Sequence, residues 1–217
     1  MEGPKKIVIY GTGGLGREVH DIAETMRAWD IVGWLDDGPY SVTSSLRGLP
    51  ILGGGEWLAR QEPLAVAVGI GAPQVRQKIF AKVRAAGHQI ATIISPHAVV
   101  GQGVEIGEGV ILMQNSVITT DAVVGEGAIL NAGCVAAHDS RLGAFATMAP
   151  LSGLMGFSVI EEGVNLGAGA IVMPSVTVGE WSIVGAGAVL KEDVPPNVTV
   201  VGVPGRIVKT REPGWHE

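Results

Sequence analysis

Hydrophobic residues recur every six positions from Val100 to Pro195, without a break in register. The first position of each hexad is aliphatic or Met in fifteen of sixteen hexads, with Ala136 as the exception, and the fifth is Val, Ala, Ser or Cys in all sixteen. Neither the helical period of 3.6 nor an alternation of two produces this pattern. It predicts a short strand and a corner every six residues, with a large side chain pointing inward and a small one at the corner, as is typical of a β-helix. Gly fills the second position seven times, and we expect these glycines to permit positive φ at the corners.

The first 94 residues follow a different pattern, in which apolar strands alternate with amphipathic helices. We expect strands at residues 6–10, 31–35, 64–68 and 89–94, long helices at 17–29 and 74–86, a short helix at 56–60 and a loop at 39–49. This alternation predicts a Rossmann-like α/β domain with a parallel sheet. We therefore expect two domains, residues 1–94 and 95–217, joined without a flexible linker, the second ending in a tail after Pro195.

Composition excludes several classes of protein. The 217 residues carry a formal net charge of −6 and no cluster of Lys and Arg, which argues against a nucleic acid partner. The chain has no apolar run of 18 residues and no signal-peptide pattern, so we expect no membrane association. A single cysteine, Cys134, forms no internal disulfide, and we expect a cytoplasmic protein.

A glycine loop follows the first expected strand. Gly11, Gly13 and Gly16 have the spacing of a phosphate-binding fingerprint between a strand and a helix. Asp36 follows Gly16 by 20 residues, at the end of the second strand, where a carboxylate can bind a ribose hydroxyl. We expect a phosphate or a nucleotide here, while a tight turn without a ligand remains the alternative. Four strands suit one nucleotide better than NAD.

His138 is the one histidine among the hexads, and it occupies a third position, which should point outward. Asp139 follows it, and an imidazole beside a carboxylate suits a general base at neutral pH. A solvated surface histidine is the competing interpretation. Cys134 occupies a fifth position and should be a small core residue, whereas Trp181 occupies a fourth position and should point outward.

The whole chain, from about residue 5 to residue 209, resembles a known family. The motifs are GTGGLGREV near the start, WLDD at the second strand, NAGCVAAHDSRLG around His138 and GAGAVLKEDVPPNVTVVGVPGRIVK at the end. The chain is similar to the sugar O- and N-acyltransferases with a left-handed β-helix, the group of the bacterial sialic acid O-acetyltransferase and the nucleotide-amino-sugar N-acetyltransferases. The resemblance implies a left-handed coil, a homotrimer and acetyl-coenzyme A in the groove between adjacent prisms.

The resemblance also implies three groups of site residues and no metal. The catalytic group is His138 as general base, the acidic Asp139, and Gly156, whose N–H meets the thioester carbonyl. The acceptor group is Asn131, Gly11, Gly13, Gly14, Asp36 and Asp37. The coenzyme group is Gly167, Ala168, Gly185 and Ala186 along the pantetheine arm, with Pro204, Arg206 and Lys209 near the adenine and 3′-phosphate.

The function expected from the sequence is acetyl transfer from acetyl-coenzyme A to the amino group of a nucleotide-linked amino sugar, a step in glycan biosynthesis. Two departures from the family concern the acceptor: Thr147 stands where a second histidine is common, and Gly69-Ile70-Gly71 where the family often has Gly-Asn. O-acetylation of a sugar hydroxyl therefore stays open as an alternative. The glycine loop also leaves open an NAD-linked oxidoreductase and a non-catalytic sugar-nucleotide sensor.

Overall fold

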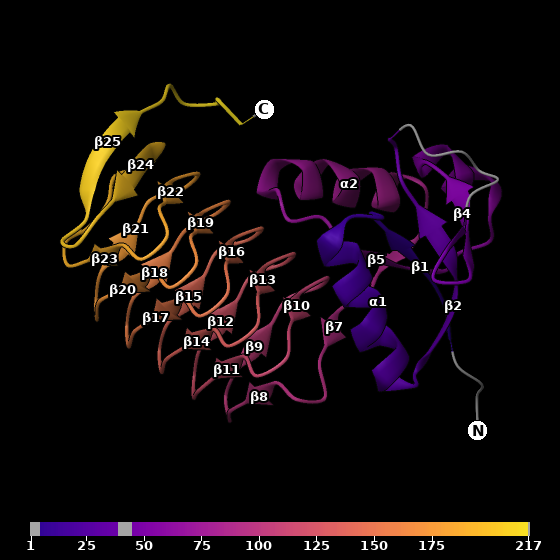
Figure 1. Cartoon of the computed structure of the whole chain (residues 1–217), viewed down its shortest axis with the longest axis horizontal. Coiled ribbons are helices and arrows are strands. Elements are labelled where there is room, and N and C mark those ends of the chain that lie inside the picture. The colour runs from indigo at the N-terminus through magenta and orange to yellow at the C-terminus, as the bar shows by residue number, and fades with distance from the viewer. Residues whose placement is uncertain (1–4, 39–44, 217) are drawn as a thin grey trace. The chain divides into compact units, whose positions relative to one another are not determined.

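A computed structural model describes residues 5–38 and 45–216 and divides the chain into two compact units, Met1–Pro96 and His97–Glu217 (Figure 1). Unit 1 is an α/β domain whose sheet has the order β3-β4-β2-β1-β5-β6. All its pairings are parallel except that of β3 with β4. Its elements are β1 (Lys5–Tyr10), α1 (Gly14–Met26), β2 (Trp29–Leu35), β3 (Ser45–Leu46), β4 (Leu49–Gly53), the 3₁₀ helix η1 (Gly55–Arg60), β5 (Ala65–Val68), α2 (Pro73–Ala85), β6 (Gln89–Ile90) and β7 (Ile93–Ile94).

The sequence prediction undercounted the strands of unit 1. Residues 39–44 of the expected loop lie outside the described residues, but its remainder contains β3 and the start of β4. The expected strand at 89–94 divides into β6 and β7. With β3 and β4 added, the sheet has six strands rather than the four expected, and β7 is not one of them. The number of strands therefore gives no reason to prefer one nucleotide over a dinucleotide as the ligand.

Unit 2 is a prism whose three faces are parallel sheets of two-residue strands (Figure 1). The first face contains β10 (Ile111–Leu112), β13 (Ile129–Leu130), β16 (Thr147–Met148), β19 (Asn165–Leu166) and β22 (Ile183–Val184). The second contains β8 (Val99–Val100), β11 (Val117–Ile118), β14 (Val135–Ala136), β17 (Gly153–Leu154), β20 (Ile171–Val172) and β23 (Val189–Leu190). The third contains β9 (Glu105–Ile106), β12 (Val123–Val124), β15 (Arg141–Leu142), β18 (Val159–Ile160) and β21 (Thr177–Val178).

The hexad positions have the burial that their pattern predicts. First-position side chains from Leu112 to Leu190 are buried, and so are the fifth-position residues from Val110 to Val194. Cys134 is one of the latter, fully buried, with its Sγ 3.1 Å from the Ala149 carbonyl oxygen. Inward apolar stacking and small corner residues thus form one continuous core along the prism.

The corners differ from the prediction in one respect. Positive φ occurs at the fourth position of fifteen hexads, from Gly103 to Gly187, and not at the second-position glycines. The latter are required by close packing of successive coils: a Cβ on Gly101 would lie 2.0 Å from the Thr119 carbonyl oxygen, and one on Gly125 would lie 2.6 Å from the Ala144 nitrogen. Their role is therefore to let two coil backbones approach closely.

The tail after the last hexad folds back onto the prism. β24 (Val198–Val201) pairs in parallel with β22, and β25 (Arg206–Thr210) pairs with β24 in the antiparallel sense. Trp181 lies at its corner beside Gly163, and it is buried because the His216 ring of the tail stacks on it at 3.6 Å. In the described ranges 5–38 and 45–216, no helix has the length and hydropathy needed to span a membrane.

Candidate functional site

His138 and Asp139 lie at a corner between the second and third faces of the prism. Successive corners stack there, and we call this stack, residues 101–103, 119–121, 137–139, 155–157, 173–175 and 191–193, the His138 column. The His138 side chain is 52% exposed, and its Nδ1 lies 2.9 Å from Asp139 Oδ2. Asp139 occupies the fourth hexad position with φ of 58°, a conformation that Asp tolerates better than most residues. The coil geometry therefore sets the carboxylate beside the imidazole.

Gly156 lies one coil further along the same column. A Cβ at this position would be 2.6 Å from His138 Cε1 and 2.7 Å from Nε2, so the imidazole occupies the space that any other residue would fill. Its carbonyl oxygen accepts a hydrogen bond from the Ser175 N–H, at 3.0 Å, while its own N–H has no partner within the described part of the chain. The Phe157 ring contacts His138 edge-on, with the ring centroids 5.2 Å apart.

This arrangement can accept a proton and stabilise a developing oxyanion. If Nδ1 carries the proton and donates a hydrogen bond to Asp139 Oδ2, Nε2 is left as an acceptor. Asp139 would also stabilise the imidazolium that forms when Nε2 takes up a proton. An unpartnered backbone N–H close to that imidazole is the kind of donor that meets an oxyanion.

Asn131 lies at a different corner of the coil, separated from His138 by β14. We call this stack, residues 113–115, 131–133, 149–151, 167–169 and 185–187, the Asn131 column. Asn131 Nδ2 donates a hydrogen bond to the Met148 carbonyl oxygen, at 2.8 Å. The structure thus brings His138, Asp139 and Gly156 together but leaves Asn131 on another edge. The same column holds the expected pantetheine residues Gly167, Ala168, Gly185 and Ala186, of which the two alanines are exposed.

Two of the three expected tail residues line one cavity of about 320 Å³. Pro204 and Arg206 lie in its wall together with Lys191, whereas Lys209 lies on β25 outside it. Lys191 was missed by the sequence analysis, although it is the one cation at the second position of a hexad. Glu192 and Asp193 line the same cavity, so its wall carries two cationic and two anionic side chains. The two cations are the side chains that can pair with a phosphate group.

The glycines of the loop in unit 1 divide into two kinds. Gly11 has φ of 110°, and a Cβ on Gly16 would fall 1.9 Å from the Gly11 carbonyl oxygen, so both are needed for the turn itself. Gly13 and Gly14 are exposed, and a Cβ on either would meet no atom within 4 Å. Gly13 is the N-cap of α1 and supplies no side-chain cap, which leaves the helix N-terminus open to an anion.

Asp36 braces the glycine loop. Its Oδ2 accepts hydrogen bonds from the Thr12 N–H at 2.9 Å and from the Thr12 hydroxyl at 2.6 Å, and its Oδ1 accepts one from the Gly38 N–H at 2.8 Å. Burial alone would raise the pKa of Asp36, but these hydrogen bonds outweigh it and hold the pKa below its usual value. The Asp36 carboxylate is therefore ionised, and its hydrogen bonds to Thr12 hold the glycine loop in place.

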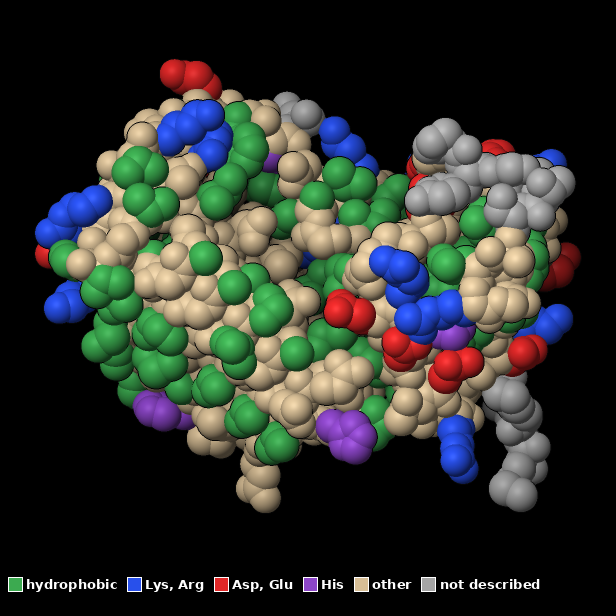
Figure 2. Space-filling view, in the orientation of Figure 1, with side chains coloured by type: hydrophobic (Ala, Val, Ile, Leu, Met, Phe, Trp, Pro, Cys, Tyr) green, Lys and Arg blue, Asp and Glu red, His purple; other side chains and the backbone are tan. Residues whose placement is uncertain are grey.

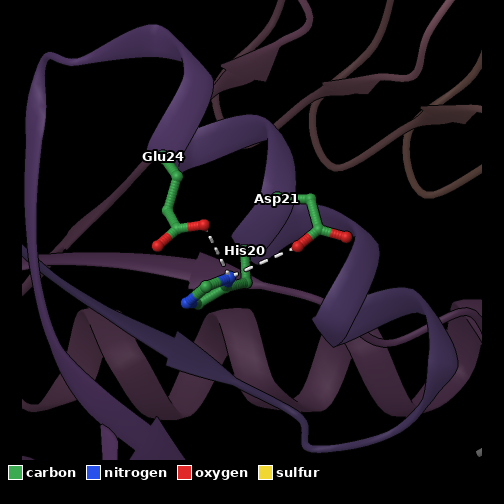
Figure 3. A group of neighbouring side chains, drawn as sticks. All are labelled: His20, Asp21 and Glu24. Atoms are coloured by element: carbon green, nitrogen blue, oxygen red, sulfur yellow. Dashed lines mark ion pairs between the residues drawn. The ribbon is translucent and has the colours of Figure 1, made fainter. Parts of the chain in front are cut away.

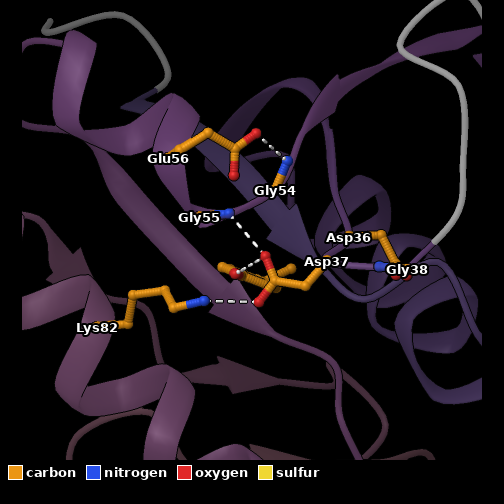
Figure 4. A network of polar contacts seen from close by, with 8 residues as sticks. Asp36, Asp37, Gly38, Gly54, Gly55, Glu56 and Lys82 are labelled. Carbon is orange, nitrogen blue, oxygen red and sulfur yellow. Dashed lines mark hydrogen bonds and ion pairs between the residues drawn. The ribbon is translucent and has the colours of Figure 1, made fainter.

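Asp37 joins four elements of unit 1 (Figure 4). Its carboxylate accepts hydrogen bonds from the Tyr10 hydroxyl at 2.8 Å and the Gly55 N–H at 2.9 Å, and it pairs with Lys82 Nζ at 2.7 Å. Burial raises the pKa of Asp37, but these partners, Lys82 first among them, lower it further than burial raises it. Burial of the Tyr10 hydroxyl, and next the neighbouring Asp37 carboxylate, raise the pKa of Tyr10.

Arg76 on α2 is a second residue that the sequence analysis missed. It is fully buried, and its Nη1 donates to the carbonyl oxygens of Ile70 and Gly71, both at 2.8 Å. These carbonyls belong to the segment after β5, and a Cβ on Gly69 in that segment would lie 2.5 Å from Gly16 Cα. Arg76 therefore supports the segment that packs against the glycine loop.

Two family models match the chain. Residues 6–83 match the PglD N-terminal domain, and residues 157–192 match the bacterial transferase hexapeptide model of six repeats. The perosamine N-acetyltransferase structure from Caulobacter crescentus, in complex with CoA and GDP-perosamine, is 35% identical, with a TM-score of 0.89 over 96% of this chain and 98% of that one. This chain belongs to the same family of hexapeptide-repeat sugar acetyltransferases.

Other acetyltransferases are also similar to this chain over most of its length. The acetyltransferase domain of PglB from Neisseria gonorrhoeae, solved with acetyl coenzyme A, is 28% identical, with a TM-score of 0.87 over 95% of this chain and all of that one. GDP-perosamine N-acetyltransferase of Escherichia coli O157:H7 is 32% identical over 65% of this chain and 66% of its own length. Further curated acetyltransferases match over shorter stretches, and the chain spans only 22–33% of their length. The family and the left-handed β-helix predicted from the sequence are confirmed.

Proposed function

We propose that this protein transfers an acetyl group from acetyl-coenzyme A to the amino group of a nucleotide-linked amino sugar. The observation that carries the proposal is the arrangement of His138, with Asp139 on Nδ1 and Gly156 against the opposite side of the ring. Its supporting context is a relative solved with CoA and GDP-perosamine that is similar over almost the whole chain.

The first step is attack of the amine nitrogen on the thioester carbonyl carbon. The amine attacks in its neutral form, because an ammonium has no lone pair. Attack leaves a positive charge on the nitrogen, and His138 Nε2 takes the proton that this nitrogen loses. A positioned base contributes about 10²–10⁴-fold to such a step. Asp139 keeps the imidazole in the correct tautomer and stabilises its positive charge.

The tetrahedral intermediate carries a negative oxygen, for which the Gly156 N–H is the proposed donor. One such donor contributes about 10²–10³-fold. When the carbon–sulfur bond breaks, the amide forms and the coenzyme leaves as a thiolate, which is protonated from the imidazolium. No covalent enzyme intermediate is needed.

The two columns of the prism support a site shared between subunits. The proposed base lies in the His138 column, whereas the proposed pantetheine contacts lie in the Asn131 column, on the other edge of the second face. We propose that the protein is a homotrimer in which the His138 column of one prism faces the Asn131 column of the next. Acetyl-coenzyme A would lie in that groove, with Asn131 near the acceptor.

The tail cavity supports the remaining coenzyme contacts. Lys191 and Arg206 would bind its phosphates, with Pro204 against the adenine, while Lys209 would contribute only long-range positive charge. For the acceptor, we propose that its diphosphate binds at the exposed Gly13 and Gly14, at the N-terminus of α1, with Asp36 and Asp37 near the nucleoside.

The experiment is a thiol-release assay with acetyl-coenzyme A and a panel of acceptors, on the wild type and on His138→Asn. GDP-linked and other nucleoside-diphosphate-linked amino sugars should release thiol, whereas the free amino sugar should require a far higher concentration. His138→Asn should lower kcat by about 10²–10⁴-fold and leave binding of the coenzyme nearly unchanged. Wild-type turnover in His138→Asn, or equal efficiency with the free amino sugar, would contradict the proposal.

A further inference from the structure

Helix α1 carries three potential metal ligands within reach of one another: His20, Asp21 and Glu24 (Figure 3). The His20 side chain is only 4% exposed, and its ring stacks on Trp34 with a centroid separation of 5.2 Å and an interplanar angle of 14°. The two carboxylates are on the solvent side of the helix. One buried nitrogen ligand and two accessible oxygen ligands thus meet at one place in unit 1.

The His20 imidazole has no hydrogen-bond partner on either ring nitrogen within the described part of the chain. Its Nδ1 points between the carboxylates, 3.5 Å from Asp21 Oδ1 and 3.6 Å from Glu24 Oε2, and both separations exceed a hydrogen bond. A buried nitrogen without a partner is costly.

These separations match the edges of a metal coordination polyhedron. Ligand atoms about 2.0–2.2 Å from a tetrahedral Zn²⁺ lie about 3.4 Å from one another. The three donor atoms of His20, Asp21 and Glu24 all lie within 4.8 Å of each other. Over residues 5–38 and 45–216, this is the one grouping of three such side chains that meets that criterion. The ring stack on Trp34 fixes the imidazole plane, a role that an outer hydrogen bond often has in metal sites.

We propose that His20 Nδ1, Asp21 and Glu24 bind one divalent transition-metal ion of the zinc class, with water completing its coordination. One imidazole and two carboxylates are a donor set that suits Zn²⁺ and its neighbours in the first transition row, rather than Ca²⁺ or Cu⁺. The site lies within helix α1 of unit 1, and we assign it a structural role. The inference goes beyond the proposed function and does not depend on it.

Arg47 would compete with a metal ion for the Asp21 carboxylate. Its guanidinium, from the turn between β3 and β4, pairs with the same Asp21 oxygen that faces His20. A positive charge there opposes a cation, and the Arg47 side chain is 37% exposed and can move into water. Metal binding should therefore release Arg47 from Asp21, and removal of the guanidinium should tighten binding.

The test is titration of the full-length protein with Zn²⁺ by calorimetry, and with Co²⁺ followed by visible absorption. The wild type should bind one equivalent and show a higher melting temperature with the ion. Asp21→Asn and Glu24→Gln change exposed side chains, should fold normally, and should weaken binding by tenfold or more, since loss of outer-shell groups alone costs about 10–100-fold. Arg47→Met should bind more tightly than the wild type. Glu18→Gln, the same charge change elsewhere on α1, should have no effect.

Two results would overturn the inference. One is that neither the wild type nor Arg47→Met binds Zn²⁺ saturably. The other is that Asp21→Asn and Glu24→Gln bind it as tightly as Glu18→Gln, which would place the ion at other histidines. Because acetyl transfer is measured separately, either result would leave the proposed function unaffected.

Discussion

Single positions in the hexad carry distinct backbone constraints that the hydrophobic pattern does not reveal. The fourth position is left-handed in fifteen of the sixteen hexads, including those in which it is Asn115, Phe157 or Trp181. The second-position glycines are set by the approach of the next coil, which is a contact 18 residues away in sequence. The inward positions were predictable because burial imposes a period. Backbone contacts between coils do not affect the pattern of polar and apolar side chains. The second-position glycines were therefore wrongly expected to adopt positive φ.

Gly156 allows the proposed base to be tested without touching its titratable groups. Its φ is not in the left-handed region, and Ala stands at the same hexad position in Ala132 and Ala168, so the coil accepts Ala there. In Gly156→Ala the three atoms nearest to the new methyl group would all belong to the His138 ring. A displacement of about 1 Å can cost about 10²-fold in rate. We expect kcat to fall by about that factor with a nearly unchanged melting temperature.

The matched control is Gln102→Ala, at the same hexad position of the His138 column but away from the imidazole. It should keep wild-type turnover. If Gly156→Ala kept the wild-type kcat, the position of the His138 ring beside Gly156 would not be the one used in catalysis.

Among the elements, strong apolar strands and long helices were predictable, and the irregular region between β2 and β5 was not. β4 has the sequence LPILG, in which Pro50 and Gly53 are typical of turns, yet it pairs with β2, and Ile51 at its centre is buried. α1 begins at Gly14, earlier than predicted, because tertiary packing, such as the close approach of Gly69 to Gly16, overrides the poor helix propensity of glycine. The glycine loop itself was predictable from spacing, but its supports, Thr12 and Arg76, depend on tertiary contacts.

The Asp37 network should give unit 1 a characteristic response to acid. Because the folded pKa of Asp37 lies below its unfolded value, its stabilising contribution is fully present above about pH 4 and is lost as the pH falls through the folded pKa. Asp37→Asn should lower the melting temperature at pH 7, since it leaves Lys82 and the other donors with a neutral partner. It should also flatten the decline of stability below about pH 4.

Melting curves of both proteins between neutral and acid pH measure this effect. Asp30→Asn, an exposed carboxylate in the same unit, is the control and should follow the wild type. If the melting temperature of the wild type and of Asp37→Asn declined equally with falling pH, protonation of Asp37 would not be the cause of the acid response.

At the scale of the whole molecule, the second face of the prism has an apolar exterior. Its outward residues are Val99, Val117, Val135, Gly153, Ile171 and Val189. In the view of Figure 2, the surface of the prism carries many hydrophobic side chains, interspersed with uncharged ones, and few charged side chains. The face is flanked by Leu151, 71% exposed, in the Asn131 column and Phe157, 59% exposed, in the His138 column. Both are large residues in left-handed conformations, which is costly and unusual. On the face itself Val99 and Val135 are exposed, and the other valines and Ile171 are half-buried. Exposed apolar surface of this kind is typical of an interaction site.

The proposed trimer accounts for this face, because it would cover Leu151 and Phe157 while bringing the two columns of neighbouring prisms together. We expect light scattering to give a mass near three times 22.4 kDa. Leu151→Asp should dissociate the trimer, since an apolar interface opposes burial of an unpaired carboxylate. It should not unfold the prism, because Asp tolerates the left-handed conformation better than Leu. Activity should fall together with the mass, because a separated chain holds only half of the site. Arg141→Asp, a charge change on the third face, should keep both mass and activity. A Leu151→Asp monomer with wild-type turnover would place base and coenzyme within one chain and rule out the shared groove.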